Sequence, residues 1–272
     1  MPRQRPTEAV LDETRDLDRR SVAEILRAIH DQDRVALEAV ERVLPQIATA
    51  VDALVSVVAG GGRWFNIGAG TSGRMGALDA AEIPPTFGLP AHRVQAIVAG
   101  GEPAMMHAVE DAEDDAEEVR KRLCELRLAA SDAVVAISAS GRTPFATGGV
   151  EAAHAVGARS IAITSDPDSA LALAAQIAIV PETGAEVIAG STRLKAGLAQ
   201  KMVLHLLSTT AMVRLGHVDG NLMANLMPTS QKLRDRRLRI VMEMAGVDEA
   251  AASRALEACG GVVADAVRFA RS

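Results

Sequence analysis

The sequence predicts an α/β fold in which a parallel β-sheet is covered by helices on both faces. Short apolar runs indicate five strands, and stretches of helical periodicity lie between them. Strands that alternate with helices in this way form βαβ units, which imply a parallel sheet. The five runs are Trp64–Ile67, Val94–Val98, Ala133–Ile137, Ser160–Thr164 and Gln176–Val180.

Helices are expected on either side of the predicted sheet along the chain. Residues Ser21–His30 and Asp33–Val58 carry apolar side chains at helical spacing, as do Ser191–Val213 and Ala224–Met244. Beyond Gly246 the pattern predicts two short helices. We therefore expect an αβα sandwich with three parts: N-terminal helices in residues 1–58, an α/β domain in residues 59–220, and a C-terminal helical segment with a small helical appendage in residues 221–272.

The composition narrows the possible partners. Aromatic residues make up 2% of the 272 residues and Tyr is absent, which disfavours single-stranded nucleic acids because they stack on aromatic rings. The net charge of −6 argues against polyanions, although backbone amides can still hold a small phosphate. The polar N-terminus lacks the core of a signal peptide, and no apolar run reaches about 18 residues. We expect a cytoplasmic protein that binds neither nucleic acid nor membrane.

The segment Gly68–Gly73 fits the G-x-G-x-x-G pattern of dinucleotide-binding loops. Such a loop needs an acidic residue about 20 positions later to bind the ribose. Gly88, Leu89 and Pro90 occupy that stretch, and Glu102 comes too late. The pattern therefore favours a ligand smaller than NAD.

Two loops rich in hydroxyl groups follow predicted strands and open predicted helices. Both fall at carboxyl ends of strands, where ligands of parallel sheets bind, and their amides and hydroxyls could surround a phosphate monoester. The alternative is that Ser and Thr only cap the following helices. We name the two loops, Gly68–Gly73 and Ser138–Pro144, the phosphate cradle; its candidate ligands are Gly70, Thr71, Ser72, Ser138, Ser140, Gly141, Arg142 and Thr143.

Four longer strings extend this pattern: GAGTSGRMGALDAAEIPPTFG, AVEDAEDD, SASGRTPF and GSTRLKAGLAQK. The paired loops resemble the sugar isomerase (SIS) domain, and the four strings, in this order, resemble the N-acetylmuramic acid 6-phosphate etherases. The resemblance runs from about Asp16 to the end of the chain. It implies an SIS-type sandwich and an enzyme of amino-sugar recycling from the cell wall.

The resemblance also implies a reaction. The family removes the lactyl ether from carbon 3 of the sugar, which leaves N-acetylglucosamine 6-phosphate and D-lactate. The ring-opened aldehyde acidifies the hydrogen on carbon 2, so that a base removes it, lactate leaves, and water then adds. One base and one acid suffice for these steps, and no metal or cofactor is expected, since no His, Cys or Asp cluster has metal-ligand spacing.

The resemblance points to Glu82 and Glu113 as the two catalytic carboxyl groups. Glu82 precedes Pro84 and Pro85, so we expect it to leave a helix end about one turn after the first cradle loop and to face the pocket. Glu113 lies in the run EDAEDDAEE, which could equally be a solvated helix start. We expect Glu113 to be the base and Glu82 the acid, although the sequence alone does not decide between these roles.

Further candidates lie near the predicted helix 191–213. Glu186 could bond a sugar hydroxyl, or it could be a surface acid beside a helix. Lys195 and Arg193 could bind phosphate or carboxylate, or pair with a neighbouring acid, and Ser191 belongs to the same group of candidate ligands.

Two alternatives to the etherase and one expected assembly stay open at this point. A non-catalytic sugar-phosphate regulator of the glucokinase regulatory type and an aldose–ketose isomerase are the alternatives to the etherase, because both use the same cradle. We expect a homodimer whose interface completes the site. The reason is that helices 33–58 and 191–213 offer more apolar surface than one sheet face covers.

Overall fold

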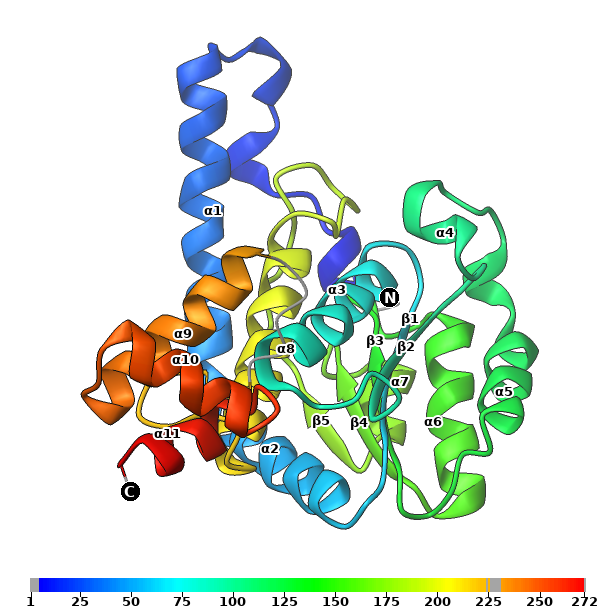
Figure 1. Cartoon of the computed structure of the whole chain (residues 1–272). Helices are drawn as coiled ribbons and strands as arrows, with labels where there is room; N and C mark the ends of the chain where they lie inside the picture. Colours follow the sequence, from blue (N-terminus) through cyan, green and yellow to red (C-terminus); the bar gives the residue numbers. More distant parts are fainter. Residues whose placement is uncertain (1–4, 224, 226–230, 272) are drawn as a thin grey trace.

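The computed structural model describes residues 5–223, 225 and 231–271. It confirms the α/β fold, with five parallel strands in the order β2-β1-β3-β4-β5 (Figure 1). Each predicted strand is present to within one or two residues at its ends: β1 Trp64–Gly68, β2 Val94–Val98, β3 Ala133–Ile137, β4 Arg159–Ile163 and β5 Ile177–Ile179.

Helices precede, separate and follow the strands along the chain. Those before β3 are α1 Val22–Arg42, α2 Leu44–Ala59, α3 Gly70–Phe87, α4 Pro103–Met106 and α5 Ala116–Glu125. Those after β3 are α6 Pro144–Val156, α7 Ala170–Ala174, α8 Lys195–Arg214, α9 Gln231–Ala245, α10 Glu249–Ala258 and α11 Val263–Arg271. Short 3-10 helices precede α1 at Pro6–Glu8, Asp12–Thr14 and Leu17–Arg19, and another, η4, spans Ala112–Asp114.

The strands divide their side chains between two apolar cores because successive residues point to opposite faces. Trp64, Val135 and Ile137 belong to a core shared with α1, α2, α3 and α8. Phe65 and Val134 belong to a core shared with α5, α6 and α7 on the other face. The sheet is therefore covered on both sides, as its apolar strands require.

The N-terminal helices break at a different place from the one predicted. Helix α1 continues through residues 31 and 32, and the break falls at Val43, which is both the C-cap of α1 and the N-cap of α2. Pro45 at the start of α2 accounts for this position, since proline fits the first turn of a helix but not its interior. Nothing in residues 31 and 32 interrupts a helix.

Helices α3 and α8 run side by side in the same direction. Ser72 contacts Gln200, Asp79 contacts Ser208, and the carbonyl of Phe87 accepts a bond from the ring of His217. The contacts advance along both helices together, so the two amino ends lie at the same edge of the sheet.

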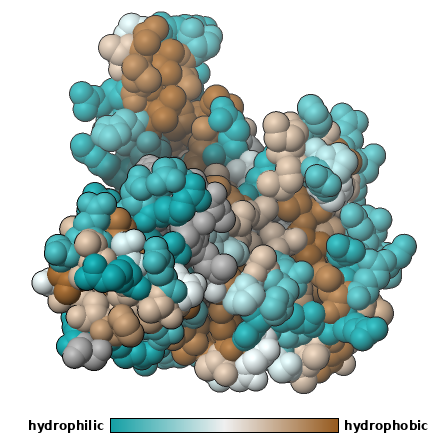
Figure 2. All heavy atoms as spheres, viewed as in Figure 1, coloured by the Kyte–Doolittle hydropathy of each residue, from teal (hydrophilic) through white to brown (hydrophobic). Residues whose placement is uncertain are grey.

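Helix α8 is largely buried within the chain. Val203, Leu204 and Leu207 are 0% exposed and pack with α1, α2 and α3, whereas Leu198 is 36% and Val213 46% exposed. Much of the apolar surface expected on residues 191–213 is thus covered within the chain, and the homodimer stays a prediction. Large apolar side chains with higher exposure lie on the projecting helix α1, where Val22 is 74% and Leu26 62% exposed (Figure 2).

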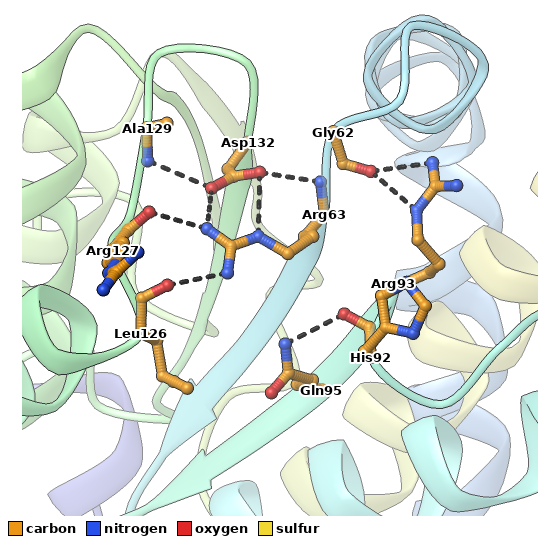
Figure 3. A network of polar contacts seen from close by, with 9 residues as sticks. All are labelled: Gly62, Arg63, His92, Arg93, Gln95, Leu126, Arg127, Ala129 and Asp132. Atoms are coloured by element: carbon orange, nitrogen blue, oxygen red, sulfur yellow. Dashed lines mark hydrogen bonds and ion pairs between the residues drawn. The ribbon is translucent and has the colours of Figure 1, made fainter.

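An ion pair fastens the amino ends of β1 and β3. Arg63 and Asp132 immediately precede these strands, and Asp132 accepts bonds from the Arg63 guanidinium at 2.6 Å and from its backbone N–H at 2.8 Å. The guanidinium also donates to the carbonyls of Leu126 and Arg127, and Ala129 N–H donates to Asp132 (Figure 3). This network stabilises the edge of the sheet opposite the cradle.

The C-terminal helices α9, α10 and α11 share an apolar cluster of their own, which includes Val241, Ala255 and Val267. The two short helices predicted after Gly246 are confirmed as α10 and α11. Part of the predicted helix 224–244, namely residues 224 and 226–230, lies outside the described residues. The division of the chain at 58 and 220 stays a prediction.

Among the described helices, no single one has the length and apolarity to cross a membrane. The consecutive helices α1 and α2 meet that criterion only as a pair, which is bent by 59°.

Candidate active site

The strand order brings the two cradle loops together. Strands β1 and β3 are neighbours in which Gly68 pairs with Ile137, so the segments after them leave the sheet side by side. From β1 the chain continues to β2 on one side of this pair, and from β3 it continues to β4 on the other side. The strand order therefore reverses direction between β1 and β3. Such a switch point is where parallel sheets bind their ligands.

The glycines of the first loop allow helix α3 to begin against the end of β1. Gly70 has φ +52° and starts the helix. A Cβ on Gly73 would lie 2.4 Å from the carbonyl oxygen of Gly68, so a side chain has no room there. Thr71 and Ser72 occupy the first turn, where free backbone N–H groups and the helix dipole favour an anion.

The second loop is ordered by its own hydroxyl groups. Ser138 Oγ lies 2.9 Å from Thr143 Oγ1 and accepts a bond of 3.1 Å from Gly141 N–H. Ser140 Oγ accepts a longer bond of 3.3 Å from Arg142 N–H. Thr143 is the N-cap of α6 but makes no side-chain capping bond. The capping alternative is therefore wrong for Thr143, and its hydroxyl bonds Ser138 instead.

Arg142 carries its charge beside the second loop but is held by an acid. Its guanidinium lies 3.1 Å from Asp166 Oδ2, and the Asp166 side chain is buried while that of Arg142 is half exposed. Asp166 follows β4, so this pair joins the loops of two strands. No local pattern indicated this partner, which reduces the net charge that Arg142 offers to a ligand.

A cavity of about 390 Å³ opens beside the first loop and brings Gly70 and Glu113 together. Its other wall is formed by Ala104 and residues 108–113, including Glu110 and Asp111. Glu113 is exposed in η4, and Asp111 before it adopts the left-handed conformation with φ +61°. The surface-exposed acidic run thus borders a cavity at the amino end of α3.

Arg74 is a residue of this cavity that the sequence analysis missed. Its guanidinium donates to the carbonyls of Ala104 at 2.8 Å and His107 at 2.9 Å, and so ties α3 to the wall of the cavity. Its position inside the string GTSGRMG was the available signal. The contacts join residues about 30 positions apart and could not be read from local sequence.

Glu82 lies elsewhere, and the expectation that it leaves a helix end is wrong. Helix α3 continues through Pro84 and Pro85 to Phe87, because buried Ile83 and Phe87 pack the last turn onto the core and Gly88, with φ +69°, ends it. Twelve residues separate Glu82 from Gly70, about 18 Å along the helix axis rather than one turn. Its exposed side chain does not line the cavity of Gly70 and Glu113.

Glu186 caps helix α8. Its carboxylate accepts bonds from the backbone N–H groups of Lys195, at 3.1 Å, and Ala196, at 2.9 Å. Burial raises the pKa of Glu186, and these backbone bonds oppose the rise. The side chain is 1% exposed, so the alternative of a surface acid is wrong.

Lys195 begins α8 at the same edge of the sheet. Its ammonium donates to Gln32 Oε1 of α1, and burial lowers the pKa of Lys195 while Glu186 and Glu13 raise it. Ser191 lies half-buried in the preceding loop, and Arg193 is exposed there. The N-terminal segment contacts this loop, because Thr14 Oγ1 donates to the carbonyl of Val187 at 3.0 Å. Within the described residues, no group of three His, Cys, Asp or Glu side chains is placed to hold a metal.

Solved structures share this arrangement of sheet and helices. A phosphoheptose isomerase from Francisella tularensis superposes with a TM-score of 0.56 at 22% identity, covering 71% of this chain and 99% of the other. A phosphoheptose isomerase from Neisseria gonorrhoeae superposes with a TM-score of 0.53 at 18% identity, covering 73% and 100%. At these identities the likeness establishes the fold.

Sequence comparisons identify the family. Residues 46–154 match the glucokinase regulatory protein N-terminal SIS domain, and residues 105–210 match the SIS domain. An N-acetylmuramic acid 6-phosphate etherase from Symbiobacterium thermophilum is 49% identical over 96% of this chain and 87% of its own length. Another, from Vibrio vulnificus, is 50% identical over 90% and 81%. The chain belongs to the N-acetylmuramic acid 6-phosphate etherase family.

Proposed function

We propose that the protein cleaves the lactyl ether of N-acetylmuramic acid 6-phosphate to N-acetylglucosamine 6-phosphate and D-lactate, a step in the recycling of cell-wall amino sugars. The observation that carries the proposal is the cavity shared by Glu113 and the amino end of α3, in a chain about half identical to curated etherases. A phosphate held by the cradle would leave the sugar carbons beside the carboxylate.

The reaction divides into an elimination and an addition. With the sugar ring open, Glu113 takes the proton from carbon 2, the bond from carbon 3 to the ether oxygen breaks, and Glu82 protonates the departing lactate. Glu82, now ionised, removes a proton from water. The hydroxide adds to carbon 3 of the unsaturated aldehyde, and the proton held by Glu113 returns to carbon 2. Each proton transfer of this kind contributes roughly 10²–10⁴-fold to the rate.

We propose that Glu82 acts on the site of a partner subunit. Within one chain it lies about 18 Å along α3 from Gly70, too far for both carboxyl groups to reach neighbouring sugar carbons. The exposed apolar side chains of α1, including Val22, Leu26 and Leu37, support a homodimer, because exposed apolar patches mark protein interfaces. A two-fold dimer would bring two copies of Glu82 to two cavities.

Isotope exchange separates the roles of the two carboxyl groups. With Glu82→Ala the base remains, so deuterium from the solvent should enter carbon 2 of intact substrate while lactate release nearly stops. With Glu113→Ala, exchange and release should fall together. The reverse pattern would exchange the two roles, and undiminished lactate release from both variants would remove them from the mechanism.

Subunit mixing tests whether the site is shared. We expect Glu82→Ala and Glu113→Ala proteins to be inactive alone. When the two are unfolded together and refolded at equal amounts, about a quarter of the sites should regain both carboxyl groups, because half of the dimers are mixed and each has one intact site. A mixture that stays inactive would place both glutamates in one chain, and a fully active wild-type monomer in light scattering would reject the dimer.

A second candidate function is non-catalytic sugar-phosphate sensing, which the match of residues 46–154 to the glucokinase regulatory protein domain favours. A sensor would bind the sugar phosphate and release no lactate. The enzyme is preferred because this chain retains both Glu82 and Glu113.

A further inference from the structure

Gln200 lies behind the phosphate cradle, in the interface between α3 and α8. Its side chain is 1% exposed, and its Oε1 accepts a hydrogen bond of 3.0 Å from Ser72 Oγ. Ser72 is in the first turn of α3, three positions after the N-cap Ala69. Gln200 therefore contacts a hydroxyl of the cradle from within the protein core.

The single proton of the Ser72 hydroxyl decides whether this group binds phosphate. A phosphate monoester at neutral pH offers mostly acceptor oxygens. While Ser72 donates to Gln200, its proton is not free for a phosphate oxygen, and Oγ can present only lone pairs to the anion. The bond to Gln200 in this orientation thus competes with phosphate binding.

The amide group of Gln200 has an unused donor that removes this conflict. Its Nε2 is buried and has no hydrogen-bond partner among the described residues. Buried N–H groups without an acceptor are rare, and carbonyl groups without a full set of donors are less so. A half-turn of the amide exchanges Oε1 and Nε2 with almost no change of shape. Nε2 then donates to Ser72 Oγ, and the Ser72 proton is released toward the cradle.

We infer that Gln200 is a positioning residue for phosphate: with a sugar phosphate bound, Gln200 Nε2 donates to Ser72 Oγ and the Ser72 hydroxyl donates to a phosphate oxygen. The inference rests on the proposed function only in taking a sugar phosphate as the ligand. It involves no bond cleavage, because one hydrogen bond is exchanged for another.

The substitution Gln200→Glu tests the direction of the proton. At pH 8 an ionised carboxylate accepts and never donates, so it holds the Ser72 proton inward. We expect the affinity for N-acetylglucosamine 6-phosphate and for inorganic phosphate to fall about tenfold or more, as for a lost hydrogen bond to a charged group. Gln200→Met fills similar space, but it neither holds the Ser72 proton inward nor donates to Ser72 Oγ, so its loss of affinity should be clearly smaller than that of Gln200→Glu. Equal losses in both variants would mean that Gln200 acts through packing and would overturn the inference.

A double-mutant cycle separates the proton from simple charge repulsion. In the Ser72→Ala protein, Gln200→Glu should weaken binding at least about fivefold less than it does with Ser72 present, since only repulsion remains. The same fold-loss in both backgrounds, or no loss with Ser72 present, would contradict the inference. Thermal melting of each variant identifies any that do not fold.

Neutron diffraction of the wild-type protein with inorganic phosphate bound gives a reading that needs no variant. Deuterium on the Gln200 atom that faces Ser72 supports the inference, and its absence there overturns it. Because all these measurements follow binding, a protein that binds the sugar phosphate without releasing lactate would reject the proposed function alone.

Discussion

Ser169 leaves no room for a side chain on Gly141. A Cβ built on Gly141 would lie 2.1 Å from Ser169 Oγ and 2.6 Å from Thr164 Oγ1. Ser169 is fixed in place, because its hydroxyl donates to the carbonyl of Asp166 and accepts from Ala172 N–H. The second cradle loop therefore rests directly on the loop that follows β4.

Replacing Gly141 should disrupt the cradle. Gly141→Ala adds an atom at a position with φ +63°, so both backbone strain and overpacking apply, and we expect on the order of 2–4 kcal/mol of lost stability together with loss of phosphate binding. Gly184→Ala is the matched control, since Gly184 has φ +69° and nothing within 4 Å of the added Cβ. It should cost about 1–2 kcal/mol and leave binding intact. Urea unfolding measures the stability of the two variants, and phosphate titration measures their affinity. Equal losses in Gly141→Ala and Gly184→Ala would contradict the packing argument.

The hydroxyls of Ser138 and Ser140 should differ in what they stabilise. Ser138 bonds both Thr143 and Gly141 N–H, so Ser138→Ala should lower both stability and phosphate affinity. Ser140 makes longer contacts within the loop, and Ser140→Ala should cost about 1–3 kcal/mol of phosphate binding with little change in the melting temperature. Calorimetry with N-acetylglucosamine 6-phosphate measures the affinities. Unchanged affinity in Ser140→Ala would remove it from the cradle.

Asp79 should make the protein less stable as the pH rises. Burial raises the pKa of Asp79 from 3.8 to about 6, against the bond from Ser208 and the charge of Lys201; its second oxygen, Oδ2, has no partner among the described residues. An acid whose pKa is higher in the folded state gives stability that is complete below pH 3.8 and is lost as the pH passes 6. The loss is on the order of 3 kcal/mol.

The variant Asp79→Asn should lack this pH dependence. Its amide oxygen can still accept from Ser208, and no ionisation follows. We expect its free energy of unfolding to exceed that of wild type at pH 8 and to fall less between pH 4 and 8. Denaturant melts at the two pH values measure this, and parallel curves for the two proteins would refute the assignment.

Replacing Asp132 should lower the stability of the protein and leave phosphate binding unchanged. Asp132→Ala removes the carboxylate partner of the Arg63 guanidinium, which keeps only two carbonyl acceptors, and it leaves two backbone N–H groups without their acceptor; we expect this to cost about 3–5 kcal/mol. Glu125→Ala breaks the exposed pair with Arg122 and should change stability by less than about 1 kcal/mol. Both variants, where folded, should bind phosphate like wild type, because the network of Figure 3 precedes the strands and the cradle follows them. Weakened binding would show that the two edges are coupled.

Local patterns predicted the sheet and the position of the two cradle loops after β1 and β3. The five apolar runs are strands because a parallel sheet buries both faces, and that burial leaves a continuous apolar signal. Ser138 and Gly141 could be placed at a strand end because the hydroxyl loop directly follows one of these runs. Parallel strands then guarantee that such loops share one edge of the sheet.

Features that depend on tertiary contacts were not predictable in this way. Helix α3 persists through Pro84 because buried Ile83 and Phe87 hold its last turn, and local rules favour a break there. The capping of α8 by Glu186 and the contact of Gln200 with Ser72 join segments separated in sequence. The extent to which α8 is covered could not be predicted, because periodicity does not reveal which neighbouring helices pack on it.

Isotopic labelling of the products tests whether the lactyl ether is cleaved by elimination and addition of water. When wild-type protein acts on N-acetylmuramic acid 6-phosphate in ¹⁸O-enriched water, elimination followed by addition predicts equal amounts of D-lactate and N-acetylglucosamine 6-phosphate. The label should be on carbon 3 of the sugar, and the lactate hydroxyl should keep the original ether oxygen. Label in the lactate would contradict the elimination, and binding of the substrate without lactate release would contradict the enzyme.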